Sequence, residues 1–192
     1  IFVSIASMVF GAVAAIGQRN LKRLMAYSSI SHMGFALAGL AVGTNEGIQS
    51  SLIYISIYLL MNLAFFSCLF MLKRNDIYYE DLSDLSGLSK NHPILALCLL
   101  VSLFSLAGIP PLAGFFAKFY IFLAVIKEEM YFLAIVGLLS TVVAAFYYLR
   151  VIKTIYFDSQ TEKFDINHDI GLKISLLVST VIILIYFIYP SP

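Results

Sequence analysis

Apolar residues gather in six long stretches of this chain, and short polar connections separate them. A helix needs about 20 predominantly apolar residues, at a rise of about 1.5 Å each, to cross the hydrocarbon core of a membrane. The pattern therefore predicts an all-α integral membrane protein with a single transmembrane domain over residues 1–192, built as a bundle of about six transmembrane helices. The predicted helices cover residues 1–16, 24–42, 49–72, 93–126, 130–155 and 171–189.

The fourth stretch contains 34 residues, which is too many for one straight crossing. Its middle holds Gly108, Pro110, Pro111 and Gly114. Proline lacks a backbone N–H and its ring clashes with the preceding turn, so the carbonyls of residues 105–107 lose their helical partners. The glycines permit backbone freedom and close packing. We therefore expect a helix broken between Gly108 and Pro111.

Basic residues mark alternate connections between the stretches. The chain has 12 lysines and arginines, and ten of them lie on the first, third and fifth connections or at their edges. Cytoplasmic connections of membrane proteins carry an excess of such residues. The first connection is therefore predicted on the cytoplasmic side, or on the matrix side in an organelle. The ten residues are Arg19, Lys22, Arg23, Lys73, Arg74, Lys90, Arg150, Lys153, Lys163 and Lys173.

Lys118 is the one basic residue inside an apolar stretch. A lysine at the bilayer centre costs roughly 3 kcal/mol on insertion scales, so it needs a reason to be there. Burial disfavours the charged form of a lysine, which suits a residue that carries protons. The alternative is a lysine whose ammonium reaches the membrane surface. Lys118 is remote from both ends of its stretch, which favours the proton-carrier interpretation, with the helix break admitting water beside it.

Two further polar residues are candidates for proton transfer. His32 lies within the second stretch, and its imidazole either relays protons or packs as a hydrogen-bonded core residue. Lys22 begins the same helix, and it either anchors the helix at the membrane surface or forms the inner end of a proton path. Tyr147 and Tyr148 are expected in the belt of aromatic residues at the membrane surface.

The remaining composition excludes several classes of function. All 11 acidic residues lie in connections, the net charge is +1, and no histidine–cysteine spacing indicates a metal or iron–sulfur site. Cys68 and Cys98 are expected to be small buried apolar residues. A soluble type of active site, a metal site and a nucleic-acid partner are therefore not expected.

Two local features complete the pattern. The longest connection, residues 73–92, holds Tyr78, Tyr79 and three leucines, and it is predicted to contain an amphipathic surface helix. The chain begins with Ile1 inside an apolar stretch and shows no signal peptide. We therefore expect it to be a fragment of a longer protein.

Two motifs resemble a known family. QRNLKRLMAYSSISHMGF, from Gln18, and DLSGLSKNHPILALCLLVSLFSLAGIPPLAGFFAKFYIF, from Asp84, are similar to helices of the antiporter-like family. That family comprises proton-pumping membrane subunits of NADH:quinone oxidoreductase (respiratory complex I) and large subunits of multisubunit sodium/proton antiporters. The third stretch, YISIYLLMNLAFFSCLF, lacks the histidines and lysine that this helix carries in the terminal complex I member of the family and in its antiporter relatives. The absence favours a different complex I membrane subunit over those relatives.

The resemblance implies a fold and a mechanism. It implies a fourteen-helix bundle with two inverted repeats, of which this chain holds helices nine to fourteen. It further implies that Lys118 is the ionisable residue of an outward half-channel. The glutamate and the two lysines of the first repeat would then lie upstream of this chain.

The implied function is proton translocation coupled to quinone reduction. The implied partners are other complex I membrane subunits and the lipid bilayer, in a bacterial inner (plasma) membrane or a mitochondrial inner membrane. NADH, FMN, iron–sulfur clusters and quinone are expected elsewhere in the complex, with no cofactor in this chain. The alternatives are a sodium/proton antiporter subunit and a packing subunit in which Lys118 forms a static ion pair.

Overall fold

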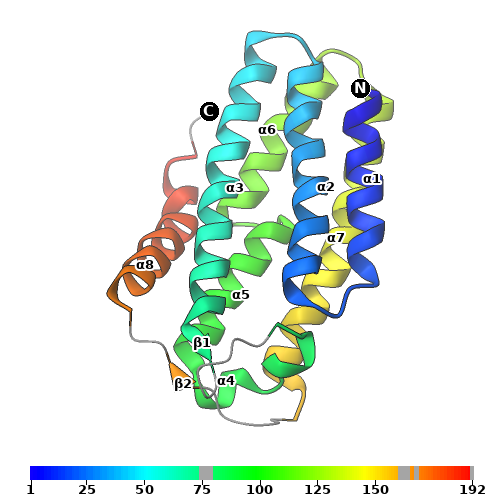
Figure 1. Cartoon of the computed structure of the whole chain (residues 1–192). Coiled ribbons are helices and arrows are strands. Elements are labelled where there is room, and N and C mark those ends of the chain that lie inside the picture. The colour runs from blue at the N-terminus through cyan, green and yellow to red at the C-terminus, as the bar shows by residue number, and fades with distance from the viewer. Residues whose placement is uncertain (74–79, 160–164, 167–168, 191–192) are drawn as a thin grey trace.

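The chain forms a bundle of helices in a computed structural model that describes residues 1–73, 80–159, 165–166 and 169–190 (Figure 1). The α-helices in chain order are α1 (Phe2–Ile16), α2 (Leu21–Ala41), α3 (Asn45–Met71), α4 (Leu88–Asn91), α5 (Pro93–Ala107), α6 (Ala113–Lys127), α7 (Tyr131–Phe157) and α8 (Ile170–Ile185). The short elements are β1 (Leu72–Lys73), η1 (Leu82–Leu85), β2 (Asp165–Ile166) and η2 (Tyr186–Ile188).

Four helical segments in the described part of the chain are long and apolar enough to cross a membrane: α2, α3, α7 and the run from α8 through η2. Helices α1 and α5 are shorter apolar helices. The predicted all-α membrane class is therefore confirmed. The described residues also form two strands of two residues each, β1 and β2, which pair antiparallel.

Two helices begin earlier than the hydropathy pattern predicts. Helix α2 begins at Leu21 instead of residue 24, because the Asn20 side chain accepts a hydrogen bond from Arg23 N at 3.1 Å. Helix α3 begins at Asn45 instead of residue 49, because the Thr44 hydroxyl accepts one from Gly47 N at 3.2 Å. Such caps satisfy the free N–H groups of a first turn. A hydropathy pattern does not detect a polar first turn as part of an apolar helix.

The segment 93–126 is not one continuous helix. Helix α5 ends at Ala107 and α6 begins at Ala113, and Figure 1 shows the two following one another along the bundle. At the C-terminal end, α8 stops at Ile185 and a 3-10 turn continues to Ile188, where a single helix to residue 189 was predicted.

The connection 73–92 was predicted to contain an amphipathic surface helix. Its described part holds the 3-10 turn η1 and the single turn α4, whereas Tyr78 and Tyr79 lie outside the described residues. The described part of the connection binds the start of α2. Leu21 N donates to Glu80 O at 2.6 Å, and Leu82 N donates to Arg19 O at 2.8 Å.

Small and hydroxylated residues bring α1 against α2. Ser4 Oγ donates to Gly34 O at 2.7 Å, and Ser31 Oγ donates to Met8 O at 3.2 Å. In lipid, helices associate through close packing and hydrogen bonds, since lipid tails are as apolar as leucine. These contacts hold α2 against α1, and Figure 1 shows α2 between α1 and α3. Ser28, Ser31 and His32 of α2 are buried.

Candidate functional site around a buried lysine

The break between α5 and α6 is built on a left-handed glycine. Gly108 has φ +85°, and its N–H donates to Phe104 O at 3.1 Å and Ser105 O at 2.9 Å. A glycine in this conformation ends a helix at little conformational cost. Pro110 and Pro111 follow, joined by a cis peptide bond, and neither continues the helix.

Ser105 holds the two helices of the break together. Its hydroxyl accepts a hydrogen bond from Gly114 N, in the first turn of α6, at 3.0 Å, and donates to Met61 Sδ at 3.0 Å. A Cβ atom on Gly114 would collide with the backbone carbonyl of Ser105. The predicted role of Gly114 in close packing thus has a specific partner. Ser105 itself was missed, because a single serine in an apolar stretch is a weak signal.

Lys118 points back into this break from α6. Its side chain is 4% exposed, and Nζ donates to Leu106 O at 3.2 Å and Ala107 O at 3.3 Å. These are two of the carbonyls expected to lose helical partners at the break. The ammonium therefore sits at the C-terminal end of α5, where the helix dipole favours positive charge.

An aromatic ring also lies beside the Lys118 ammonium. Nζ lies 5.3 Å from the centroid of the Phe35 ring, a distance at which a cation and an aromatic face attract each other. No carboxylate of the described residues forms an ion pair with Lys118. Burial opposes the charged form, whereas two carbonyls and a ring favour it, so the site balances two opposing effects.

His32 stands at the centre of a second buried cluster. It is 2% exposed, its Nδ1 is 2.7 Å from Tyr54 Oη, and its Nε2 is 3.1 Å from Tyr148 Oη. The imidazole stacks on Tyr58 with centroids 4.8 Å apart. Tyr148 Oη also forms a hydrogen bond with Ser28 Oγ. Both ring nitrogens thus have hydroxyl partners in a protected interior.

The prediction that Tyr147 and Tyr148 belong to an aromatic belt is wrong. Both side chains are fully buried, and Tyr148 contacts Ser28 and His32 of α2 inside the bundle. Sequence reasoning also missed Tyr54 and Tyr58. Their spacing of four residues on α3 puts both on one helix face, which is the signal that was available.

Aromatic rings connect the two clusters. Phe35, which faces Lys118, stacks on Tyr54 with centroids 6.0 Å apart, and Tyr54 is the hydrogen-bond partner of His32. The structure therefore brings these two sequence-predicted residues into one interior site, to which α2, α3, α5, α6 and α7 contribute.

Lys22 lies apart from this site, at the end of the bundle. It forms an ion pair with Glu80, which also accepts a hydrogen bond from Asn20 Nδ2 at 3.1 Å. These hydrogen bonds hold the pKa of the Glu80 carboxyl below its ordinary value. The pair joins the start of α2 to the connection that follows β1.

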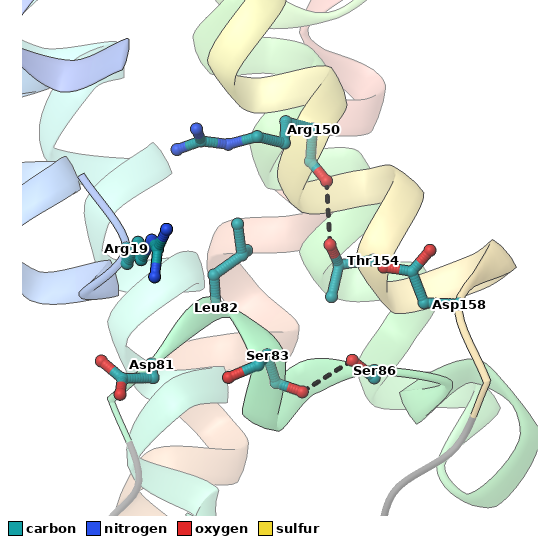
Figure 2. Close-up of a pocket in the computed structure, with 8 residues that line it drawn as sticks. All are labelled: Arg19, Asp81, Leu82, Ser83, Ser86, Arg150, Thr154 and Asp158. Carbon is teal, nitrogen blue, oxygen red and sulfur yellow. Dashed lines mark hydrogen bonds between the residues drawn. The ribbon is translucent and has the colours of Figure 1, made fainter. Parts of the chain in front are cut away.

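A polar pocket of about 490 Å³ opens at the same end, between the start of α2, η1 and the last turns of α7 (Figure 2). Figure 2 shows the Arg150 side chain extending from α7 across the pocket. Its two terminal nitrogens donate to Ile16 O at 2.7 Å and Gln18 O at 2.6 Å. The lining residues are Arg19, Asp81, Leu82, Ser83, Ser86, Arg150, Thr154 and Asp158.

The described part of the chain contains no group of three or more histidine, cysteine, aspartate or glutamate residues that would hold a metal ion. Cys68 is buried and its Sγ donates to Leu95 O at 3.3 Å, while Cys98 is half-buried. The buried polar groups around Lys118 and His32 are amine, imidazole and hydroxyl groups.

Curated relatives support the resemblance inferred from the motifs. NADH-quinone oxidoreductase subunit N of Pelagibacter ubique is 75% identical over 191 residues, which covers 100% of this chain and 41% of the relative. The subunit N of Parvibaculum lavamentivorans is 53% identical over 192 residues, which covers 100% of this chain and 40% of that relative. The chain thus spans about two fifths of the length of these relatives.

Solved structures share the fold. A chain of respiratory complex I from Thermus thermophilus is 29% identical with a TM-score of 0.84, covering 98% of this chain and 43% of that chain. A chain of the Mrp complex from Dietzia sp. DQ12-45-1b has a TM-score of 0.83 and covers 97% of this chain and 43% of that chain. At 19% identity, this match shows similarity of fold alone.

The family match covers most of the chain. Residues 1–144 match the transmembrane family described as NADH:quinone oxidoreductase/Mrp antiporter. Together with the apolar helices, this match makes the protein a multi-pass membrane protein. The chain belongs to the NADH:quinone oxidoreductase/Mrp antiporter transmembrane family.

Proposed function

We propose that this chain forms part of a proton-translocating membrane subunit of NADH:quinone oxidoreductase, in which Lys118 accepts and releases protons. The observation that carries the proposal is the buried Lys118 ammonium, held by two helix-end carbonyls and paired with no described carboxylate. An ammonium bound in this way can lose its proton without leaving a buried negative charge unpaired.

The hydroxyl and imidazole cluster supplies the rest of the proposed path. Protons pass along Ser28, Tyr148, His32 and Tyr54, whose hydrogen bonds are continuous. The Phe35 ring beside Lys118 cannot carry a proton, so the last step to Lys118 requires water beside that ring. Lys22, at the end of α2, is proposed as part of the inner end of the path. Electrostatic changes along the complex would alternately favour and disfavour the charged lysine.

The proposal includes a membrane arrangement. Helices α5 and α6 together make one crossing, so that the chain crosses six times as one domain, as the second half of the longer family fold. Its partners are other complex I membrane subunits and lipid, and the membrane is the bacterial inner membrane, since the relatives named above are bacterial. NADH, FMN, iron–sulfur clusters and quinone would bind elsewhere in the complex.

Replacing Lys118 by methionine tests the proposal. The change removes the charge and keeps the length of the side chain. In membranes that contain the assembled complex, we expect fewer protons pumped per electron and slower NADH-driven quinone reduction. Lys127→Met is the matched control, because Lys127 is an exposed lysine of the same helix that pairs with Glu46. Normal pumping and turnover in the Lys118→Met complex would contradict the proposal.

Replacing Lys118 by arginine distinguishes a proton-transporting role of this residue from a packing role. Arginine keeps the positive charge but does not release its proton in proteins. We therefore expect the Lys118→Arg complex to assemble and to pump poorly. Full pumping with arginine would instead support the static ion-pair role. No observation favours the sodium/proton antiporter alternative, since the antiporter neighbour is 19% identical and the subunit N relatives reach 75%.

A further inference from the structure

The Phe35 ring lies between the two buried clusters. Phe35 follows His32 by three residues on α2, and residues three apart share one face of a helix. Lys118 Nζ lies over the Phe35 ring, 5.3 Å from its centroid, and the ring of Tyr54 stacks on it with the two planes inclined by 28°. Phe35 therefore contacts both the lysine and a hydrogen-bond partner of His32.

Packing from other helices fixes the direction of this ring. Phe122 of α6 meets Phe35 edge-on, with centroids 6.1 Å apart and planes at 85°. Gly137 of α7 leaves room for this pair, since a Cβ atom there would lie 2.9 Å from Phe122 Cε1 and 3.4 Å from Phe35 Cε1. Side chains of α3 and α6 and the backbone of α7 thus hold Phe35 with its face toward the ammonium.

Lys118 has two kinds of contact in this site. Its Nζ donates to the carbonyls of Leu106 and Ala107. A neutral amine keeps two N–H groups, so both carbonyls can retain a donor after the lysine releases its proton. The face of an aromatic ring is negative and attracts a cation within about 6 Å of the centroid, most strongly where water is excluded. Of these contacts, the one with Phe35 therefore depends most on the charge of the lysine.

We infer that Phe35 stabilises the charged form of Lys118 through the contact of its ring face with the ammonium, and that this contact controls how readily the lysine takes up a proton. The inference rests on the proposed function, because it concerns proton uptake by the same lysine. No carboxylate of the described residues pairs with Lys118, so the ring supplies part of the attraction that a carboxylate would give. A ring attracts a cation more weakly than a carboxylate does, so the lysine can still release its proton.

Graded fluorination of the ring tests this electronic role. Phe35 is replaced by phenylalanines that carry one, two or three ring fluorines, which withdraw charge from the ring face and change its size little. In the assembled complex, we expect the number of protons pumped per electron to fall stepwise with each fluorine, severalfold over the series. A residue that only fills space would show no such trend.

The same series at Phe65 is the matched control. Phe65 is a similarly buried phenylalanine of α3, and it packs edge-on against Phe66. Among the described residues, it faces no cation. Fluorination there should leave pumping unchanged. Equal pumping across the Phe35 series would overturn the inference, as would an equal decline in the Phe65 series.

Natural side chains provide a second test. Phe35→Leu removes the aromatic face and keeps an apolar side chain, whereas Phe35→Tyr keeps the face. With assembly verified, we expect the Phe35→Leu complex to pump severalfold less than the wild type, and the Phe35→Tyr complex to pump several times better than the Phe35→Leu complex. Normal pumping by Phe35→Leu would overturn the inference, and so would equal losses in both variants, since these would show a role in packing alone.

The Lys118→Met complex distinguishes this inference from the proposed function. If Lys118→Met abolishes pumping while fluorination of Phe35 has no effect, the role of the ring is wrong and the proposed function stands. If Lys118→Met pumps normally, the proposed function itself is wrong.

Discussion

Ser105 and Gly114 decide how closely the two helices of the break approach each other. The Ser105 hydroxyl caps α6 from a different helix, since it accepts from Gly114 N while Leu112, at the N-cap position, offers no side-chain bond. The carbonyls that hold Lys118 belong to Leu106 and Ala107, the two residues that follow Ser105. Ser105 therefore positions the lysine site through the backbone and does not touch the ammonium.

Replacing Ser105 by alanine should loosen the start of α6. Loss of a helix cap costs about 1 kcal/mol, and Gly114 N would lose its partner. We expect faster hydrogen–deuterium exchange at the Gly114 amide, with the helix otherwise intact. Ser102→Ala is the matched control, because Ser102 is equally buried but donates only to Cys98 O of its own helix. Unchanged exchange at Gly114 would show that the hydroxyl does not hold the break closed.

At the scale of elements, the separation of α5 and α6 controls the lysine site. Gly114→Ala places a methyl group against the backbone carbonyl of Ser105, which cannot easily move aside. Overpacking of this kind costs about 1–3 kcal/mol. We expect a lower melting temperature of the purified subunit and reduced pumping, because α6 shifts and Lys118 Nζ moves away from its carbonyl partners.

Gly17→Ala is the control for that substitution. Gly17 follows α1 with φ −78°, and nothing lies within 4 Å of the position that a Cβ would take. It should leave stability and pumping unchanged. If Gly114→Ala were equally silent, the close approach of the two helices would be unimportant for the site.

On the scale of the whole molecule, the connections alternate between the two ends of the bundle. The start of α2, the end of α3 and the end of α7 lie together at one end, which is the lower end in Figure 1. The polar pocket and the Lys22–Glu80 pair lie at that end as well. Lys127 and Glu46 form an ion pair at the opposite end, with Nζ and Oε2 separated by 2.6 Å.

This arrangement predicts that residues 93–127 cross the membrane once. Lys90 precedes α5 and Glu128 follows α6, and both are exposed. Cysteines at these two positions should react with an impermeant thiol reagent from opposite sides of the membrane, Lys90→Cys from the inner side. Labelling of both from the same side would mean that the broken segment enters and leaves by one face, and the count of six crossings would be wrong.

Much of the fold followed from the apolar pattern alone. Hydropathy predicted the helical membrane class, and the Gly-Ile-Pro-Pro run predicted the position where α5 ends, because both depend on local chemistry. The caps at Asn20 and Thr44 were not anticipated, since polar first turns lower the hydropathy on which the helix limits were based.

The sequence by itself determined which residues are costly in a membrane: one lysine, one histidine and a pair of prolines inside apolar stretches. Only the tertiary structure decided what each of them meets. Lys118 faces two carbonyls of another helix, and His32 faces tyrosines of α3 and α7. His32 and Tyr148 are 116 residues apart in the chain, whereas Lys118 reaches carbonyls 11 and 12 residues away across the helix break. Packing brings these partners together because a polar group in lipid must find its hydrogen bonds within the protein.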